Sequence, residues 1–396
     1  MAYGVQQARM ARAVQAVQEQ GVDVWISYAR EMDYAGDAFL RAILPMNLFG
    51  SVAVLVTASG EKIVLTRRLE AEELEDSGLF TQIVVYDGEI SIELADVLKR
   101  LSPKKIALNF SNKDYTADGL TYTGFRILEH AFQEAGFCGE IVSAERLMKL
   151  VRGKKSPEEV EGIRFAVQEA MKIFEEARGQ MRLGMSGMDV QRLFQRLTDE
   201  RHYGYSWSKY GNPFNSIGTK TSYLCKRPAS DVVIEPGDVI NVDFGISVND
   251  FSSDNQRTFY ALRPGEDVPP PEVQKAFDTL GRVNEAVISG MRPGVNSYDL
   301  LERANSILRA AGYPESRGGF GHEIGLYAHD GVLAPASRSC EPEVSAELLE
   351  GMTFAVEPAI ITSFGRVCRE EVAVVTRDGG RFLSTPQPEI WLIQKD

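Results

Sequence analysis

Residues 239–262 read VINVDFGISVNDFSSDNQRTFYAL, with two aspartates, Asp243 and Asp254, 11 positions apart. Each aspartate lies beside apolar, strand-like sequence, and Gly, Asn and Ser residues fill the interval between them. The spacing predicts a hairpin whose two arms place both carboxylates side by side. Two buried carboxylates at that separation repel each other unless they are protonated or bridged by a cation. The pair therefore indicates a metal site or, alternatively, ordinary turn chemistry without a ligand.

A second segment that could form part of a functional site is GHEIGL at 321–326, followed by AHD at 328–330. It contains His322 and His329, two of the four histidines in the chain. A lone histidine is more often a packed or solvated residue than a ligand. Flanking glycines favour a site here, because they permit close approach of the backbone.

Two glutamates stand next to apolar sequence nearer the C-terminus. Glu357 ends the apolar run FAVEP at 354–358, and Glu370 opens another run in REE at 369–371. A glutamate at a strand end is usually solvated, so each is weak evidence when taken singly. Their position next to inward-facing apolar residues favours a buried role.

The order of these segments resembles the pita-bread metallopeptidases, the superfamily of methionine aminopeptidase, aminopeptidase P, prolidase and creatinase. In that superfamily an Asp, a second Asp 11 residues later, a His in GHxxG, a Glu in an EP step and a Glu before VTxDG occur in this order. The chain has this series at Asp243, Asp254, His322, Glu357 and Glu370, with VTRDG at 375–379. Each motif alone is common, whereas the conjunction is specific.

The resemblance implies a centre of two divalent cations, Mn²⁺, Co²⁺ or Zn²⁺, held by those five side chains, a hard ligand set that suits these metals. It also implies a metallopeptidase closest to the Xaa-Pro dipeptidases. Such an enzyme would cleave Xaa-Pro dipeptides or N-terminal Xaa-Pro bonds of small peptides through a metal-bridging hydroxide. Glu357 would accept a proton from the water, and His329 would stabilise the tetrahedral intermediate.

Three departures from the family pattern bear on the substrate. The loop YLCKRP at 223–228, around Cys225, lacks the histidine that family peptidases have there, and EPG has become EPA at 357–359. Cys368 occupies the place of an arginine. The missing histidine leaves open a non-peptidase relative, a lyase or a hydrolase of a small amide or amidine, that uses the same metal centre. A metal-free binding module is disfavoured, because all five ligand residues are present.

The last ligand has two possible positions. An R-x-E pattern would select Glu371, whereas the VTxDG anchor selects Glu370. We adopt Glu370, because a deletion inside a strand would turn every later side chain to the opposite face.

Outside these motifs, the patterns predict an α+β protein of two domains. Residues 1–150 alternate helical and strand patterns, which is typical of α/β structure and, by resemblance, of a creatinase-like domain. A boundary follows at 151–156, where Ser156 can cap a long helix that begins at Pro157. Residues 156–396 would form the pita-bread catalytic domain. The expected elements are helices over 5–19, 157–177, 188–201, 271–289 and 297–311, and strands over 22–27, 52–56, 62–65, 83–86, 106–108, 239–246, 257–262, 353–361 and 370–376.

The composition is that of a globular enzyme. The 396 residues exceed what one hydrophobic core usually organises, and 44% of them are hydrophobic. A net charge of -13 argues against nucleic acid or an anionic membrane as partner. No export signal, membrane-spanning stretch or paired cysteines are evident, so we expect a cytoplasmic location with reduced thiols. The resemblance implies a homodimer, in which the first domain of one subunit shields the active site of the other.

Overall fold

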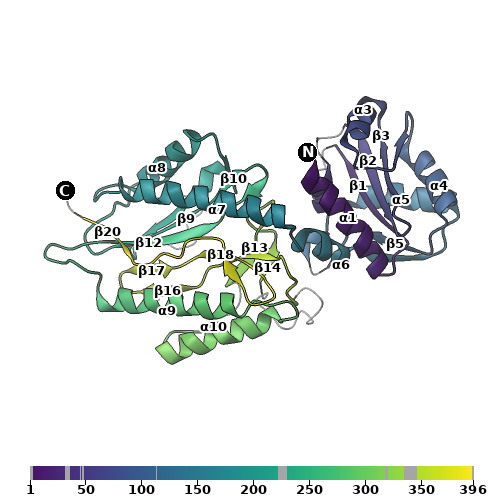
Figure 1. The fold of residues 1–396 in the computed structure, drawn as a ribbon. Coiled ribbons are helices and arrows are strands. Elements are labelled where there is room, and N and C mark those ends of the chain that lie inside the picture. The colour runs from purple at the N-terminus through teal and green to yellow at the C-terminus, as the bar shows by residue number, and fades with distance from the viewer. Residues whose placement is uncertain are drawn as a thin grey trace. The chain divides into compact units, whose positions relative to one another are not determined.

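The computed structural model describes residues 3–31, 36–44, 46, 49–112, 114–221, 230–316, 320–333 and 346–394. The chain divides into two compact units, Met1–Ser156 and Pro157–Asp396, both drawn in Figure 1. Each unit combines helices with β-sheet, so the predicted α+β class is confirmed. Among the helices in the described ranges, none is both long and apolar enough to cross a membrane.

The first unit is built on a six-stranded sheet with the order β4-β3-β2-β1-β5-β6. Strand β1 pairs antiparallel with β2 and parallel with β5, so the sheet is mixed. Helix α1 packs on one face of the sheet, and α4 and α5 pack on the other. The elements are α1 (Gly4–Glu19), β1 (Val24–Arg30), α2 (Ala38–Ile43), β2 (Ser51–Thr57), β3 (Lys62–Thr66), α3 (Arg68–Ser77), β4 (Gln82–Val85), α4 (Ile90–Leu101), β5 (Lys105–Leu108), η2 (Tyr115–Ala117), α5 (Tyr122–Ala135), β6 (Glu140–Ser143), α6 (Glu145–Met148) and η3 (Lys149–Gly153).

The predicted helix and strands of this unit are present, but helices α2, α3, α4, α5 and α6 were not predicted. Two further differences concern strand β6 and the domain boundary. Strand β6 was not predicted, because it is a four-residue strand at the sheet edge and half of it is exposed. The predicted break at 151–156 begins later than expected, because the π-helical segment η3 continues as far as Gly153.

The second unit contains two larger sheets, with the orders β20-β12-β9-β8 and β14-β13-β15-β18-β19, and two smaller ones, β11-β10-β7 and β16-β17. Helices α7 and α8 lie on one side of the strands, and α9 and α10 lie on the other (Figure 1). The elements are α7 (Pro157–Arg178), α8 (Gly187–Asp199), β7 (Gly204–Tyr205), η4 (Lys209–Gly211), β8 (Phe214–Ile217), β9 (Val239–Phe244), β10 (Ile246–Val248), β11 (Phe251–Ser252), β12 (Asn255–Ala261), α9 (Pro271–Ser289), α10 (Ser297–Ala311), β13 (Gly321–Glu323), β14 (Gly331–Val332), β15 (Thr353–Val356), β16 (Ala359–Thr362), β17 (Gly365–Cys368), β18 (Glu371–Val374), β19 (Arg381–Phe382) and β20 (Trp391–Ile393).

The predicted hairpin between the two aspartates consists of two successive strand pairs. Strands β9 and β12 pair with Asp243 opposite Gln256, and the chain then turns at Gly245 into the separate pair β10 and β11. A Cβ atom at Gly245 would lie 2.1 Å from the Ser253 carbonyl oxygen, so only glycine fits there. The turn itself is Asn249-Asp250, both with positive φ, the pattern of a tight two-residue hairpin turn.

The single strand predicted over 353–361 is wrong. It is two strands of different sheets, β15 and β16, separated at Glu357 and Pro358. Proline has no N–H group to donate to a sheet, so the ladder stops there and the chain crosses to a new partner, β17. This break places Glu357 at the end of a strand, between two sheets.

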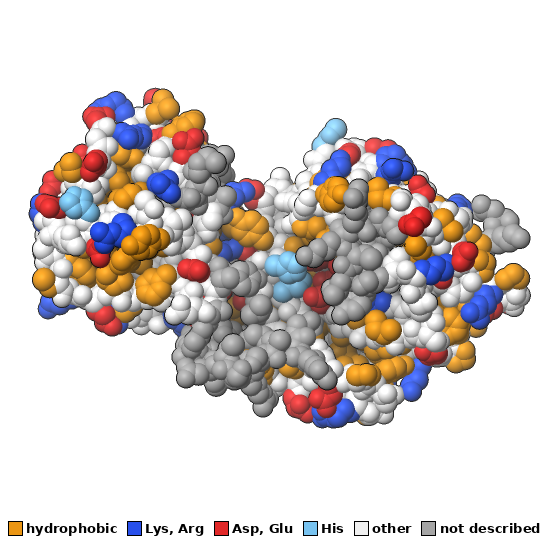
Figure 2. All heavy atoms as spheres, turned by 180° about the vertical axis from the view of Figure 1, so that it is seen from behind, with side chains coloured by type: hydrophobic (Ala, Val, Ile, Leu, Met, Phe, Trp, Pro, Cys, Tyr) orange, Lys and Arg blue, Asp and Glu red, His pale blue; other side chains and the backbone are white. Residues whose placement is uncertain are grey.

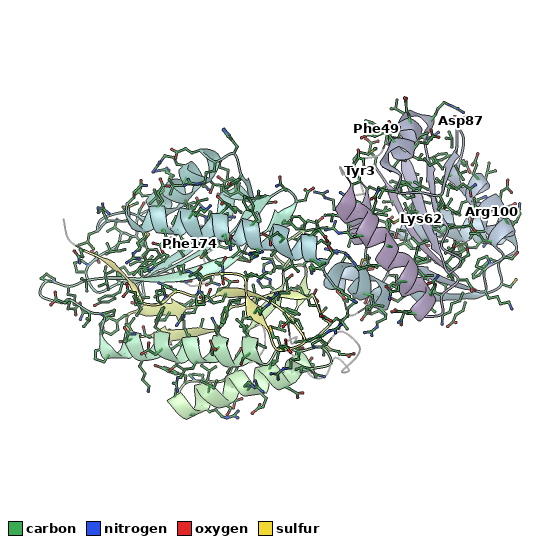
Figure 3. The ribbon with its side chains drawn as sticks, in the orientation of Figure 1. Tyr3, Phe49, Lys62, Asp87, Arg100 and Phe174 are labelled. Atoms are coloured by element: carbon green, nitrogen blue, oxygen red, sulfur yellow. The ribbon has the colours of Figure 1, made fainter. Side chains whose placement is uncertain are left out.

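An aromatic cluster joins the helices to the sheet that carries Asp243. The ring centroid of Phe174 on α7 lies 5.3 Å from that of Phe194 on α8 and 5.5 Å from that of Phe244 on β9. Phe174, labelled in Figure 3, is fully buried. The cluster therefore holds β9, and with it Asp243, against two helices.

We predict that Phe174→Ala lowers the free energy of unfolding by about 3–5 kcal/mol, because it opens a cavity that the surrounding rings cannot close. Phe165→Ala is the matched control on the same helix, since Phe165 is 44% exposed, and it should cost less than about 1 kcal/mol. Equilibrium urea denaturation followed by circular dichroism measures both. Equal losses in the two variants would contradict the role assigned to the aromatic cluster.

Candidate metal centre

Five strands of the second unit bring the five predicted ligand residues together. Asp243 lies near the end of β9, and Asp254 immediately precedes β12. The register pairs Asp243 with Gln256, so Asp254 is the diagonal neighbour of Asp243 on the same sheet face. His322 on β13, Glu357 after β15 and Glu370 before β18 come from the five-stranded sheet. Figure 2 shows histidine and acidic side chains next to each other at the surface.

The donor atoms of these side chains lie close enough to share cations. His322 Nε2 is 3.5 Å from Asp254 Oδ2 and 3.8 Å from an oxygen of both Glu357 and Glu370. Three groups have donor atoms within 4.8 Å of one another: Asp254, His322 and His329; His322, Glu357 and Glu370; and Asp243, Asp254 and Glu370. All five predicted ligand residues therefore meet in one cluster.

His322 presents a lone pair to the carboxylates. Its Nδ1 atom is 3.1 Å from the carbonyl oxygen of Glu323, which leaves Nε2 as the atom that faces the cluster. Burial lowers the pKa of His322, and therefore favours the neutral imidazole that metals bind.

The carboxylates lack the partners that buried charges require. Asp254 and Glu370 are 4% and 1% exposed, yet Asp254 Oδ1 and both Glu370 side-chain oxygens have no hydrogen-bond partner within the described residues. Burial and the neighbouring Glu357 raise the pKa of Asp243 to about 7, and burial and nearby carboxylates raise the pKa values of Asp254 and Glu370 well above the usual range. Cations would supply the missing partners, so the cluster fits divalent metal ions.

The two adjacent glutamates have opposite surroundings. Glu370 points into the cluster, whereas Glu371 accepts hydrogen bonds from Arg257 at 3.1 Å and from Ser384 Oγ at 2.6 Å. Glu371 is fully buried, and the Arg257 guanidinium neutralises it. Of the two alternatives in the sequence, the structure thus brings Glu370, and not Glu371, to the cluster.

His329 lies beside the cluster and at its opening. Its ring centroid is 4.2 Å from that of His322, and its side chain is only partly exposed. Partial burial, and then the nearby His322, lowers the pKa of His329, which favours a neutral ring. The position suits an interaction with a bound substrate. A ring nitrogen of His329 also lies within 4.8 Å of donor atoms of Asp254 and His322, so His329 is close enough to be a metal ligand.

A cavity of about 370 Å³ opens onto the cluster and is lined by two chemically different sets of residues. One set consists of acidic residues and histidines: Asp243, Asp254, His322, His329 and Glu357. The other set includes aromatic rings, among which Trp207 and Phe214 stack with an interplanar angle of 9°. Such a cavity combines a polar reaction centre with an apolar surface for the rest of a small ligand.

Two residues next to the cluster were not predicted. Gln256 Nε2 donates to Glu357 Oε2 at 2.9 Å, and Arg366 Nη1 donates to Gln256 Oε1 at 2.5 Å. Alternation along β12 could have placed Gln256 on the face of Asp254, two residues earlier. Nothing in the sequence pointed to Arg366.

Cys368, which occupies the expected place of an arginine, is buried with its Sγ 3.3 Å from the carbonyl oxygen of Pro358. The loop at 223–228 with Cys225 lies outside the described residues.

Comparison with known proteins agrees with this geometry. A model of metallopeptidase family M24 matches residues 161–378, more than half of the chain. An uncharacterized peptidase of Staphylococcus saprophyticus is 25% identical over 84% of this chain and 87% of its own length. Among solved structures, an Xaa-Pro dipeptidase from Bacillus anthracis has a TM-score of 0.75 at 22% identity, covering 98% of this chain and 100% of that one. An X-Pro aminopeptidase from Thermotoga maritima has a TM-score of 0.72 at 22% identity, covering 97% and 99%. These two likenesses show the fold, including the predicted creatinase-like and pita-bread architecture.

We predict that Glu370→Gln weakens the binding of divalent metal by more than about tenfold, since even the outer partners of metal ligands contribute that much. Glu371→Gln is the matched control. It should leave metal binding unchanged but lower the free energy of unfolding by about 3–5 kcal/mol, because it leaves Arg257 buried without its counter-charge. Elemental analysis after dialysis and calorimetric titration with Mn²⁺ measure binding. The reverse pattern would show that the final ligand is Glu371.

Proposed function

The chain belongs to metallopeptidase family M24, and on that premise we propose that it hydrolyses Xaa-Pro dipeptides or the N-terminal Xaa-Pro bonds of short peptides. The observation that carries this proposal is a buried carboxylate cluster, with unpartnered oxygens on Asp254 and Glu370, that adjoins a cavity lined also by aromatic residues. The names of the solved neighbours from Bacillus anthracis and Thermotoga maritima support the choice of an Xaa-Pro bond.

In this proposal two divalent cations, Mn²⁺, Co²⁺ or Zn²⁺, are held by Asp243, Asp254, His322, Glu357 and Glu370. Asp254 and Glu370 would contribute most, because they stand between the other ligands. Each of these two carboxylates belongs to two of the close groups of donor atoms, and each has two oxygens to offer. Asp243 and Glu357 would add further oxygen donors, and His322 would add a nitrogen donor. When bound, the cations supply a Lewis acid for the scissile carbonyl and lower the pKa of a water molecule.

Glu357 is the proton acceptor in the proposed reaction. One of its oxygens, Oε2, is held by Gln256, whereas Oε1 faces His322 Nε2 at 3.8 Å. The side chain is 25% exposed, so it is accessible from the cavity. It can take a proton from the attacking water and deliver that proton to the leaving imino nitrogen of proline.

His329 is the proposed donor to the developing oxyanion. A neutral ring at the opening of the cavity can donate one N–H to the tetrahedral oxygen without carrying a charge of its own. The aromatic rings of Trp207 and Phe214, which line the cavity, would contact the apolar parts of the substrate.

We also propose that the working unit is a homodimer. Among the described residues, the groups of potential metal ligands all lie in the second unit, so the first unit is available for another role. Light scattering tests this directly, since a fully active monomer of 43.9 kDa would contradict it.

The proposed activity predicts proline release from Leu-Pro and Ala-Pro by protein loaded with Mn²⁺, Co²⁺ or Zn²⁺, and none after chelation. Leu-Ala and the tripeptide Leu-Pro-Gly serve as controls, because they separate proline selectivity from dipeptide length. Asp254→Asn, which removes a ligand, should lose both metal and activity. Metal binding without cleavage of any of these peptides would favour the non-peptidase interpretation of the same centre.

His329→Ala should lower kcat by ~10²–10³ and leave the metal content unchanged, because it removes one oxyanion donor. His202→Asn, at an exposed histidine with positive φ in the same unit, is the control and should retain full activity. Elemental analysis and steady-state kinetics on Leu-Pro decide the matter. Loss of metal together with activity would instead make His329 a ligand.

A further inference from the structure

Three polar side chains, Asn241, Gln256 and Arg366, form a row beside the carboxylate cluster. Gln256 lies opposite Asp243 in the pairing of β9 with β12, and Asn241 lies two residues before Asp243, so both share its sheet face. Arg366 reaches the row from β17, which belongs to another sheet. Its Nη1 donates to Asn241 Oδ1 at 2.7 Å and to Gln256 Oε1 at 2.5 Å.

Arg366 fixes which way the amide of Gln256 points. A guanidinium can only donate hydrogen bonds, so the amide oxygen of Gln256 must face it. The NH₂ group then faces Glu357 and donates to Oε2 at 2.9 Å. The reversed amide would set its NH₂ against the guanidinium and its oxygen against a carboxylate, and both contacts would be repulsive.

The orientation of Gln256 determines which oxygen of Glu357 is left for the cluster. Oε2 is engaged by Gln256, and Oε1 faces His322 Nε2 at 3.8 Å. Gln256 is 1% exposed, so water cannot readily replace it as the partner of Glu357. Glu357 therefore presents a single oxygen in a fixed direction.

We propose that Gln256 and Arg366 are positioning residues for Glu357. They hold its Oε2 atom, so that only Oε1 faces the cluster for its roles as metal ligand and proton acceptor. Arg366 orients Gln256, and Gln256 in turn orients Glu357. This inference rests on the proposed metal centre and adds two residues to it. Partners that orient a metal ligand typically contribute 10–100-fold to metal affinity, and that is the effect expected here.

The test measures Mn²⁺ affinity of metal-free protein by competition with a fluorescent chelator, at a temperature where every variant is folded. Gln256→Met keeps the length of the side chain and removes both hydrogen bonds, so binding should weaken by about 10–100-fold. Gln256→Asn is a milder second variant, in which the shorter amide cannot span from Arg366 to Glu357. Arg366→Met should also weaken binding, and Arg366→Lys, which keeps a charged donor, should restore part of it. In each weakened variant kcat on Leu-Pro should fall more than KM changes.

Gln191→Met is the matched control for the loss of a buried glutamine. Gln191 is 4% exposed and donates to the Tyr210 carbonyl oxygen at 3.1 Å, so its loss should lower stability without changing Mn²⁺ affinity. Wild-type affinity in Gln256→Met and Gln256→Asn would overturn the inference and leave the metal centre intact. If the wild-type protein binds no Mn²⁺, Co²⁺ or Zn²⁺, the proposed function fails, and the inference fails with it.

Discussion

Repulsion among four carboxylates, those of Asp243, Asp254, Glu357 and Glu370, is the constraint that organises the second unit. Removing such groups from water raises their pKa values, and each neighbouring negative charge raises them further. The packing of the surrounding sheets and helices must offset this unfavourable term, and bound cations would convert it into attraction. The stability of the surrounding fold therefore has to exceed the cost of burying these carboxylates without partners.

The residues of the centre come from two sheets, and Arg257 connects these sheets. From β12 its guanidinium donates to the backbone oxygen of Glu370 at 2.8 Å and to the side chain of Glu371 at 3.1 Å. It is 1% exposed, so these bonds are shielded from competition by water. The backbone that carries Glu370 is therefore fixed against the strand that follows Asp254, which explains how residues more than a hundred positions apart keep a common geometry.

Local signals were sufficient for much of the fold. Helices α9 and α10 begin and end at the predicted residues, because Pro271 opens the first and Asn296 and Gly312 cap the second. The motifs also selected five side chains whose donor atoms lie close together in the structure, and alternation along a strand separates Glu370 from Glu371. Their role as metal ligands stays a prediction. Two features depend on tertiary contacts: Pro358 marks the break in the strand locally, but no local signal gives the new sheet partner, and none gives the position of the arginine. The chain changes sheets at Pro358, and the arginine that reaches the row beside the cluster is Arg366 from β17, not a residue at position 368.

The adjacent residues Glu370 and Glu371 would be neutralised at different times, one during folding and the other after it. Glu371 meets a counter-charge encoded in the chain itself, so it is neutralised as soon as the strands assemble. The oxygens of Glu370 have no such partner among the described residues, and in the proposed centre ions from solution would neutralise them. Maturation can therefore proceed in two separable stages, folding first and loading afterwards, and the supply of metal in the cell would set the active fraction of a protein that is already folded.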